Sequence, residues 1–287
     1  MFTVDVGNVT HNELFNVVHV DEKWFYMTKL RRRFYMWHDE DQPPPRQLQS
    51  KSHITKVMFL VAVARPRHSW DGKVGCWPFL HETVALRKSV NRPAGTVIIK
   101  PTNVTKDVYR HYLIDKVIPS IKEKWIPFCA DAPATILVQQ DNARPHVDSN
   151  GPAVVRACES GGWDIRFFNQ PPQSPDLNVL DLGFFNAIQA LQQQMECKTI
   201  EELAAAVELA FAELAPATLD KTFGTLQRVF RACLAAEGGN TYDIPRLKNE
   251  APEDDDMTIK MMNLRLEEEE RLEDVFELVN GMATVEL

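Results

Sequence analysis

Grouped cysteines, long apolar runs and a positive net charge are absent from this 287-residue sequence. Its five cysteines are scattered and never form C-x-x-C, which argues against a disulfide framework or a zinc site and favours reduced, structural cysteines. No apolar run reaches the roughly 20 residues that span a membrane, and the start, MFTVDVGNVTHNELF, lacks the features of a signal peptide. We therefore expect no membrane association and a location on the cytosolic and nuclear side of membranes.

The net charge of −8 is unevenly distributed along the chain. From Glu250 onward there are 13 acidic and 3 basic residues, which leaves 29 basic and 27 acidic residues in positions 1–249. The body is therefore nearly neutral, and the acidity belongs to the C-terminal 38 residues. Charge alone neither requires nor excludes nucleic acid as a partner, because binding would depend on a local basic surface.

The first part of the chain is typical of β-strands. Residues 17–28 (VVHVDEKWFYMT) are rich in β-branched and aromatic side chains, and 34–40 (FYMWHDE) predict a second strand. Residues 56–64 (KVMFLVAVA) predict a third strand, apolar enough to be buried on both faces. Three consecutive strands imply an antiparallel meander. Residues 65–104 contain turn signals and no clear period, so we expect a long, loop-rich connection there.

Strands and helices then alternate. A helix is predicted from Thr105 to about Trp125, ended or kinked by Pro119. A short strand at 134–140 (ATILVQQ) precedes a helix around Val154–Cys158 and another strand at 163–168 (WDIRFF). This order predicts an α/β domain around a mixed sheet.

The last third of the body is predicted to be helical. One helix follows from apolar residues spaced by three and four positions, and a capping box opens the next. A final core helix is expected before Gly238 and Gly239. The residues that define these helices are Leu177, Leu180, Phe184, Ile188 and Leu191; Thr199 with Glu202; and Phe223, Leu226, Phe230 and Leu234. We assign residues 1–249 to one domain and 250–287 to an acidic, helix-prone or disordered appendage.

Three aspartates occupy positions that folding could bring together. Asp21 lies within the first strand, Asp141 follows the strand at 134–140, and Asp181 lies in the first turns of the 177–191 helix. Magnesium prefers oxygen ligands, and a few carboxylates with substrate phosphate oxygens suffice to bind it. A lone aspartate at such a position is more often a cap or turn former, so spacing alone supports this trio weakly.

The sequence around each aspartate resembles the mariner superfamily of DNA transposases. The three matching segments are HVDEKWFYMT (19–28), QQDNARPH (139–146) and QPPQSPDLNVLDLGFFNAIQ (170–189). Asp21, Asp141 and Asp181 are similar to the three acids of the family's catalytic triad. The third acid corresponds to Asp181 and not to Asp176. The gaps are 119 and 39 residues, and the 39-residue gap with a terminal Asp is similar to the plant-type branch. The resemblance runs from about Val17 to about Lys248.

That resemblance implies an RNase H-like mixed sheet flanked by helices, with additional C-terminal helices. It implies that Asp21, Asp141 and Asp181 hold two Mg²⁺ or Mn²⁺ ions, with Asp21 bridging both. The implied reaction is cleavage of transposon ends followed by strand transfer into target DNA. Double-stranded DNA is the implied partner, a homodimer is a possible assembly, no small-molecule cofactor is expected, and the implied location is the nucleus.

One feature of the family has no counterpart in this sequence. Members carry paired helix-turn-helix modules before the catalytic domain, whereas here the first predicted strand begins near residue 17. We expect a fragment, a truncated copy or a polypeptide whose recognition half is encoded elsewhere. The alternative function is a domesticated or decayed derivative that acts as a non-catalytic DNA- or protein-interaction module. An RNase H-like nuclease unrelated to transposition fits the fold but not the motifs.

Residues beside the three aspartates are secondary candidates. Asn142 could orient Asp141 or a metal-bound water, and His146 is as often a structural hydrogen bonder. Asp176 is predicted to cap the helix that carries Asp181. The densest basic cluster offers a weak candidate for DNA contact, although a solvated turn explains it equally well. The cluster consists of Lys29, Arg31, Arg32 and Arg33.

Overall fold

The computed structural model describes residues 3–5, 8–10, 14–27, 54–88, 92–127, 135–143, 151–236, 239 and 242–244. The chain divides into two compact units, Phe15–Thr222 and Met1–Leu14 with Phe223–Leu287. Two predicted features, the strand at 34–40 and the appendage at 250–287, lie outside the described residues. The domain boundary expected at residue 249 stays a prediction.

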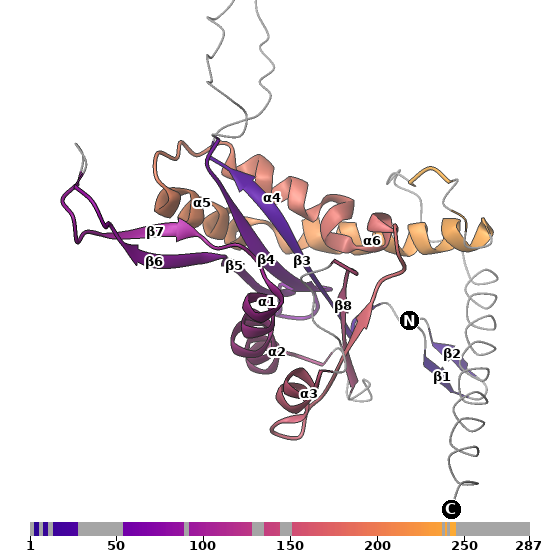
Figure 1. Cartoon of the computed structure of the whole chain (residues 1–287). Coiled ribbons are helices and arrows are strands. Elements are labelled where there is room, and N and C mark those ends of the chain that lie inside the picture. The colour runs from indigo at the N-terminus through magenta and orange to yellow at the C-terminus, as the bar shows by residue number, and fades with distance from the viewer. Residues whose placement is uncertain are drawn as a thin grey trace, which may run out of the picture. The chain divides into compact units, whose positions relative to one another are not determined.

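A five-stranded mixed sheet forms the centre of the unit Phe15–Thr222 (Figure 1). Its strand order is β5-β4-β3-β8-β9; β3, β4 and β5 are antiparallel, whereas β3, β8 and β9 run parallel. The strands are β3 (Val17–Tyr26), β4 (Lys56–Ala64), β5 (Lys73–Pro78), β8 (Thr135–Gln140) and β9 (Asp164–Asn169). The strands predicted at 17–28, 56–64, 134–140 and 163–168 are therefore confirmed, as is the mixed sheet.

The loop-rich connection predicted for residues 65–104 is wrong. This segment contains β5 and a separate two-stranded hairpin of β6 (Leu80–Val84) and β7 (Val97–Pro101). These strands are only five or six residues long, and the ladder between β4 and β5 shifts register between Ala62 and Val63. Too few residues alternate for a period to show, so pairing with neighbouring strands decides the structure.

Helices α1, α2 and α3 cover one face of the sheet. They are α1 (Lys106–Tyr112), continued by a π-helical turn (Leu113–Val117) into α2 (Ile118–Lys124), and α3 (Pro152–Glu159). Val18, Val20 and Ile136 point to this face and share a buried cluster with helix residues such as Leu113 and Ile121. Burying this apolar surface is the main driving force for the layer.

The helix predicted from Thr105 to Trp125 is confirmed, with Thr105 as its N-cap. It does not end at Pro119, which lies in the first turn of α2. The preceding π-helical turn already departs from the usual hydrogen-bond pattern, so the missing N–H of Pro119 is accommodated.

The opposite face of the sheet is covered by the segment that carries Asp181 and by α5 (Ile200–Glu213). The rings of Phe184 and Phe211 meet edge to face at 6.1 Å, and Lys73 Nζ donates to the Ala212 carbonyl at 2.6 Å. Thr199 caps α5 by accepting from the Glu202 N–H at 3.1 Å, so the predicted helix start is confirmed. Helix α6 (Pro216–Ala235) begins in this unit.

The other unit contains the antiparallel pair β1 (Thr3–Asp5) and β2 (Asn8–Thr10) and the part of α6 from Phe223 onward. No helix among the described residues is long and apolar enough to cross a membrane. The four described cysteines carry free thiols, and burial raises the pKa of the Cys158 thiol to about 11.

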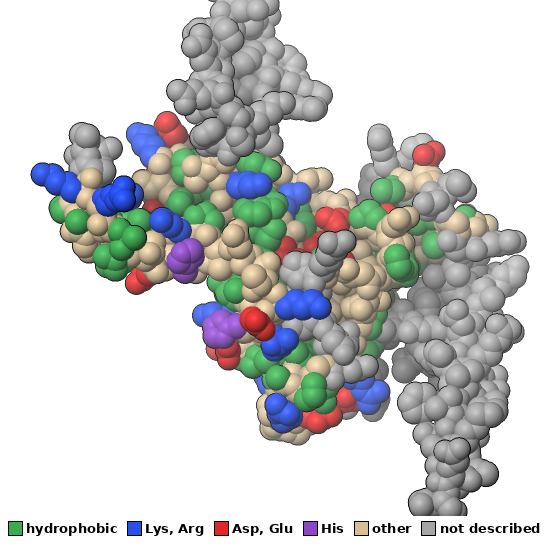
Figure 2. All heavy atoms as spheres, viewed as in Figure 1, with side chains coloured by type: hydrophobic (Ala, Val, Ile, Leu, Met, Phe, Trp, Pro, Cys, Tyr) green, Lys and Arg blue, Asp and Glu red, His purple; other side chains and the backbone are tan. Residues whose placement is uncertain are grey.

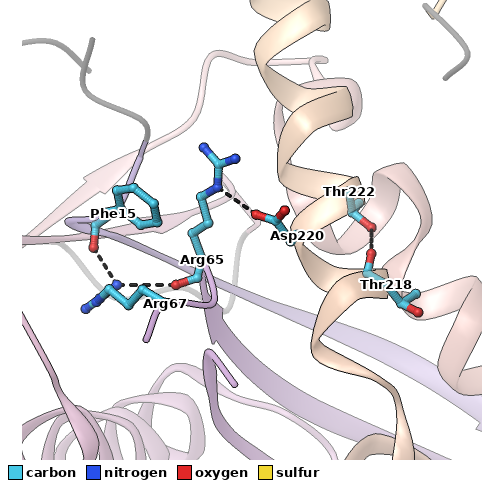
Figure 3. Close-up of polar contacts among 6 residues, drawn as sticks. All are labelled: Phe15, Arg65, Arg67, Thr218, Asp220 and Thr222. Carbon is cyan, nitrogen blue, oxygen red and sulfur yellow. Dashed lines mark hydrogen bonds and ion pairs between the residues drawn. The ribbon is translucent and has the colours of Figure 1, made fainter. Parts of the chain in front are cut away.

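Arg67 joins three parts of the unit around the start of β3. Its Nη1 donates to the Phe15 carbonyl at 2.8 Å (Figure 3), and its Nε donates to the Ile126 carbonyl. The guanidinium lies 4.6 Å from the Trp70 ring centre and 4.3 Å from that of Trp125. Burial lowers the pKa of Arg67 to about 10, so the group stays charged at neutral pH and packs as a cation against both indoles, whose ring centres are 5.6 Å apart.

We expect Arg67→Ala to destabilise the protein by about 2–4 kcal/mol, because it leaves the partly buried carbonyl groups of Phe15 and Ile126 without this donor and removes both stacking contacts. Arg65→Ala is the control: its Nε donates to Asp220 at 2.9 Å, but that carboxylate is 51% exposed. Exposed ion pairs contribute at most about 1 kcal/mol. Urea denaturation of both variants measures the difference, and equal losses would contradict the role given to Arg67.

Candidate active site

Asp21 lies in the middle of β3, the longest strand, on the face covered by α5. Only 7% of its surface is exposed. Its Oδ1 accepts the Glu22 N–H at 2.7 Å, and its Oδ2 accepts from Asn178 Nδ2 at 2.6 Å. The carboxyl group is therefore fixed in orientation on both oxygens.

Asp141 directly follows β8, the parallel neighbour of β3. The register pairs Val17 with Leu137 and His19 with Gln139. The last pair of this ladder is His19 with Gln139; continued by two residues, past the end of β8, the same register would place Asp141 next to Asp21 on the same face. The charge of Asp141 raises the pKa of both Asp21 and Asp181, so its carboxyl group lies near both. The Oδ1 atom of Asp141 accepts the Ala143 N–H at 2.8 Å, which shapes the turn after the strand.

Asp181 lies in a π-helical turn (Leu180–Phe184) that leads into α4 (Phe185–Gln192). Burial raises the pKa of the Asp181 carboxyl, while a hydrogen bond with Asp21 and the charge of Lys23 act in the opposite direction. The negative charge of Asp141 raises it as well. The structure thus brings the three aspartates into one electrostatic neighbourhood, with Asp181 in direct contact with Asp21.

Burial and the neighbouring negative charges both affect the pKa of Asp21. Burial and then the charges of Asp181, Glu22 and Asp141 raise the pKa of Asp21 well above its usual range. His19 is the preceding residue on the same face of β3. It supplies no positive charge to offset these effects, because burial lowers its pKa to about 3. Without a metal ion, one proton shared by Asp21 and Asp181 lowers the electrostatic cost of placing them together.

Asn178 is a site residue that sequence reasoning missed, although it lies within the quoted S-P-D-L-N segment. It is 2% exposed, donates to Asp21, and accepts the Leu180 N–H on its Oδ1 at 3.1 Å. The helix start expected at Asp176 is therefore wrong: Asp176 lies in a short 3-10 turn (Pro175–Leu177), and Asn178 supplies the side-chain cap. One amide thus fixes Asp21 and the turn carrying Asp181.

A second amide network holds the approach to that turn. Gln139 Nε2 donates to Gln170 Oε1 at 3.2 Å and to the Leu177 carbonyl at 2.9 Å. Asn142 Nδ2 donates to the Gln170 carbonyl at 2.6 Å. Asn142 therefore ties the loop after Asp141 to the end of β9, and its role in orienting Asp141 or a water stays a prediction.

Lys23 is the cation nearest to the aspartates in the described part of the site. It stands two positions after Asp21 on the same face of β3, and its charge lowers the pKa of Asp181. Its Nζ lies 5.3 Å from the Phe185 ring centre. The other cationic candidates and His146 lie outside the described residues; these are Lys29, Arg31, Arg32 and Arg33.

The donor set suits a hard divalent cation. Asp21 and Asp181 offer neighbouring carboxyl groups, and a bound cation would offset the burial and the nearby negative charges that raise their pKa values. Among the described residues, no three His, Cys, Asp or Glu side chains are close enough to enclose an ion. Magnesium commonly uses one or two carboxylates together with water and substrate phosphates, so the pair is sufficient to hold it.

Solved structures of the Mos1 mariner transposase share this fold. The strand transfer complex is 17% identical with a TM-score of 0.55, over 81% of this chain and 57% of that one. The paired-end complex with Mn is 17% identical with a TM-score of 0.54, over 80% and 57%. The paired-end complex with Mg is 18% identical with a TM-score of 0.53, over 79% and 56%.

The chain therefore spans a little over half the length of the transposase chains that it matches. No protein-family model and no curated protein sequence matches it. At this level of identity the likeness establishes the fold, and the RNase H-like class expected from the sequence is confirmed.

We expect metal-free wild-type protein to lose stability relative to Asp21→Asn as pH rises. The folded pKa of Asp21 is raised, so the folded state holds this proton more tightly than the unfolded chain, whose pKa is about 3.9. The stabilisation is present below that value and is lost as pH rises through the folded pKa. Thermal melts with chelator between pH 5 and pH 8 measure it.

Asp176→Asn is the matched control, since it makes the same chemical change five residues before Asp181. Its melting temperatures should follow those of the wild type across the range. Parallel curves for wild type and Asp21→Asn would show that Asp21 carries no strained charge.

Proposed function

We propose that this chain is the catalytic domain of a mariner-like DNA transposase. It would cleave phosphodiester bonds at transposon ends and transfer the freed strand end into target DNA. The observation that carries the proposal is the contact between Asp21 and Asp181, residues far apart in sequence, with Asp141 beside them on a matching fold. All three lie in segments that resemble the mariner superfamily.

Asp21, Asp141 and Asp181 would hold the divalent ions, with Asp21 as the shared ligand of two. Mg²⁺ and Mn²⁺ are the candidates, since Mos1 complexes have been solved with each. Such ions, when bound, supply a more acidic water and stabilise negative charge on the leaving oxygen. The raised pKa values of Asp21 and Asp181 mean that the pair retains a proton until a cation displaces it.

The chain's other residues position these groups. Asn178 holds Asp21 Oδ2 in place, and Gln139 holds the Leu177 carbonyl on the approach to Asp181. Lys23, on the same face as Asp21, places a positive charge where a DNA phosphate would approach the acids. Such fixed dipoles and charges favour a reaction because they need no rearrangement as charge develops.

We propose double-stranded DNA as partner, since the matching structures are of Mos1 transpososomes and their complexes with transposon ends. A homodimer and a nuclear location belong to the same proposal. The second candidate is a decayed transposase acting as a non-catalytic binding module. One observation favours it: among the described residues, no three acidic, His or Cys side chains are grouped tightly enough to enclose an ion.

Millimolar Mg²⁺ or Mn²⁺ should raise the melting temperature of the wild type, because only the folded state presents the acids together. Asp141→Asn keeps the side-chain size but removes a charge and a metal-binding oxygen, so it should reduce this gain and abolish nicking of supercoiled plasmid. Asp176→Asn is the control and should keep both.

Equal stabilisation of wild type and Asp141→Asn would place the metal elsewhere. Metal-dependent stabilisation of the wild type without nicking, even on pre-cleaved transposon ends, would favour the non-catalytic module.

A further inference from the structure

The hairpin of β6 and β7 projects from the central sheet as a ribbon, which we term the basic arm (residues 80–88 and 92–101; Figure 1). Its ladder runs from the pair Leu80 and Pro101 to the pair Val84 and Val97. It continues toward the tip, where the Ala85 N–H donates to the Thr96 carbonyl at 2.9 Å. At the base, the ribbon contacts β4 and α5. The arm is therefore a hydrogen-bonded element anchored at one end.

The basic arm concentrates positive charge in a chain whose net charge is −8. It holds four cations and one acid, Glu82, and all five side chains are exposed. None of the four cations has an ion-pair partner within the described ranges. They are Arg87, Lys88, Arg92 and Lys100. Figure 2 shows Lys and Arg side chains gathered at the left, where Figure 1 places the hairpin.

We propose that the basic arm binds the phosphate backbone of double-stranded DNA next to the cleavage site. This inference rests on the proposed transposase function and assigns a partner surface to it. Clustered, unpaired Arg and Lys side chains attract phosphates by releasing condensed counterions. A two-stranded ribbon also fits the width of the DNA major groove, so the arm has a suitable shape as well as charge.

A protein partner is the competing occupant, because the arm also exposes three apolar residues. Val84, Leu86 and Val97 are 51%, 92% and 59% exposed. They stand among the four cations, and a protein interface would have to desolvate those charges; lysine in particular is depleted from interfaces. Contact with DNA phosphates would use the four cations and would leave the apolar side chains at the edge of the interface. The charge pattern of the arm therefore favours DNA.

The strand register limits how far the arm reaches from Asp21. At the base of the arm, the Phe79 N–H donates to the Met58 carbonyl, and Met58 pairs with Trp24, three residues beyond Asp21. At about 3.3 Å per residue and about 4.8 Å per strand, the base lies roughly 14 Å from Asp21, and the hydrogen-bonded pair of Ala85 and Thr96 lies at most about 17 Å further. DNA rises about 3.4 Å per base pair, so this part of the arm would meet a duplex no more than about nine base pairs from the cut.

The test compares wild type with the triple variant Arg87→Ala, Lys88→Ala, Arg92→Ala. A fluorescence-anisotropy titration of a labelled 30-base-pair duplex, about three helical turns, gives the affinity at several salt concentrations. Losing three phosphate contacts should make the plot of log affinity against log salt shallower by about 2 to 3, with a clear loss of affinity at low salt. Melting temperature should stay unchanged, because the three side chains are exposed.

The matched control removes three exposed lysines elsewhere in the same unit: Lys106→Ala, Lys116→Ala, Lys198→Ala. It changes the net charge equally and should leave the salt slope close to that of the wild type. A photo-crosslinking residue in place of Arg92 should label the duplex, and one in place of Lys116 should not.

Equal slopes for wild type and arm variant, or equal losses in arm variant and control, would overturn the role of the arm and leave the proposed function standing. Failure of the wild type to bind duplex at any salt concentration would count against both.

Discussion

The constraint on which the site depends is the burial of one carboxyl group, that of Asp21, in the middle of the central strand. A buried carboxylate is unfavourable unless its oxygens are hydrogen-bonded. Asn178, 157 residues further along the chain, meets this requirement at 2.6 Å and uses its other amide atom to begin the turn that carries Asp181. The orientation of one acid and the position of another are therefore set by the same side chain. The Gln139 network holds the preceding loop in register with β8.

Local periodicity predicted those elements whose pattern is complete within the element. The strand at 56–64 is apolar after Lys56 and lies between β5 and β3 in the sheet, and Thr199 fixes the start of α5 by accepting the N–H of Glu202, three residues later. The β6–β7 ribbon could not be found in this way. Its strands are short and exposed on both faces, so their pairing depends on partners about 15 residues away rather than on an alternating pattern.

The three aspartates followed from the resemblance of their surroundings, because spacing alone does not distinguish them from the other acids. Asn178 is a site residue that the comparison of sequence segments does not identify. In the sequence it is one of several polar residues after a proline-rich loop, and Asp176 is an equally suitable residue type for the N-cap of the helix. Only the tertiary contact with Asp21 decides between them. Asn142 lies next to Asp141 in the sequence, and its Nδ2 donates to the Gln170 carbonyl, a tertiary contact that its place in the sequence does not predict.

Under the proposed function, a centre built from acids must receive a polyanion, and the body of this chain has almost no net charge. Close to the acids, Lys23 offsets some of the repulsion, and bound divalent cations would remove most of the remainder. Neither supplies attraction far beyond about 8 Å, the screening length at physiological salt. Attraction over the length of a duplex therefore has to come from cations placed away from the centre, on an element that holds them outward in solvent. The β6–β7 ribbon meets that need, since its pairing holds Arg87, Lys88 and Arg92 clear of the acids. If the cations of the ribbon attract the DNA, no fixed cation has to lie between the acids. The acids then stay free to bind metal.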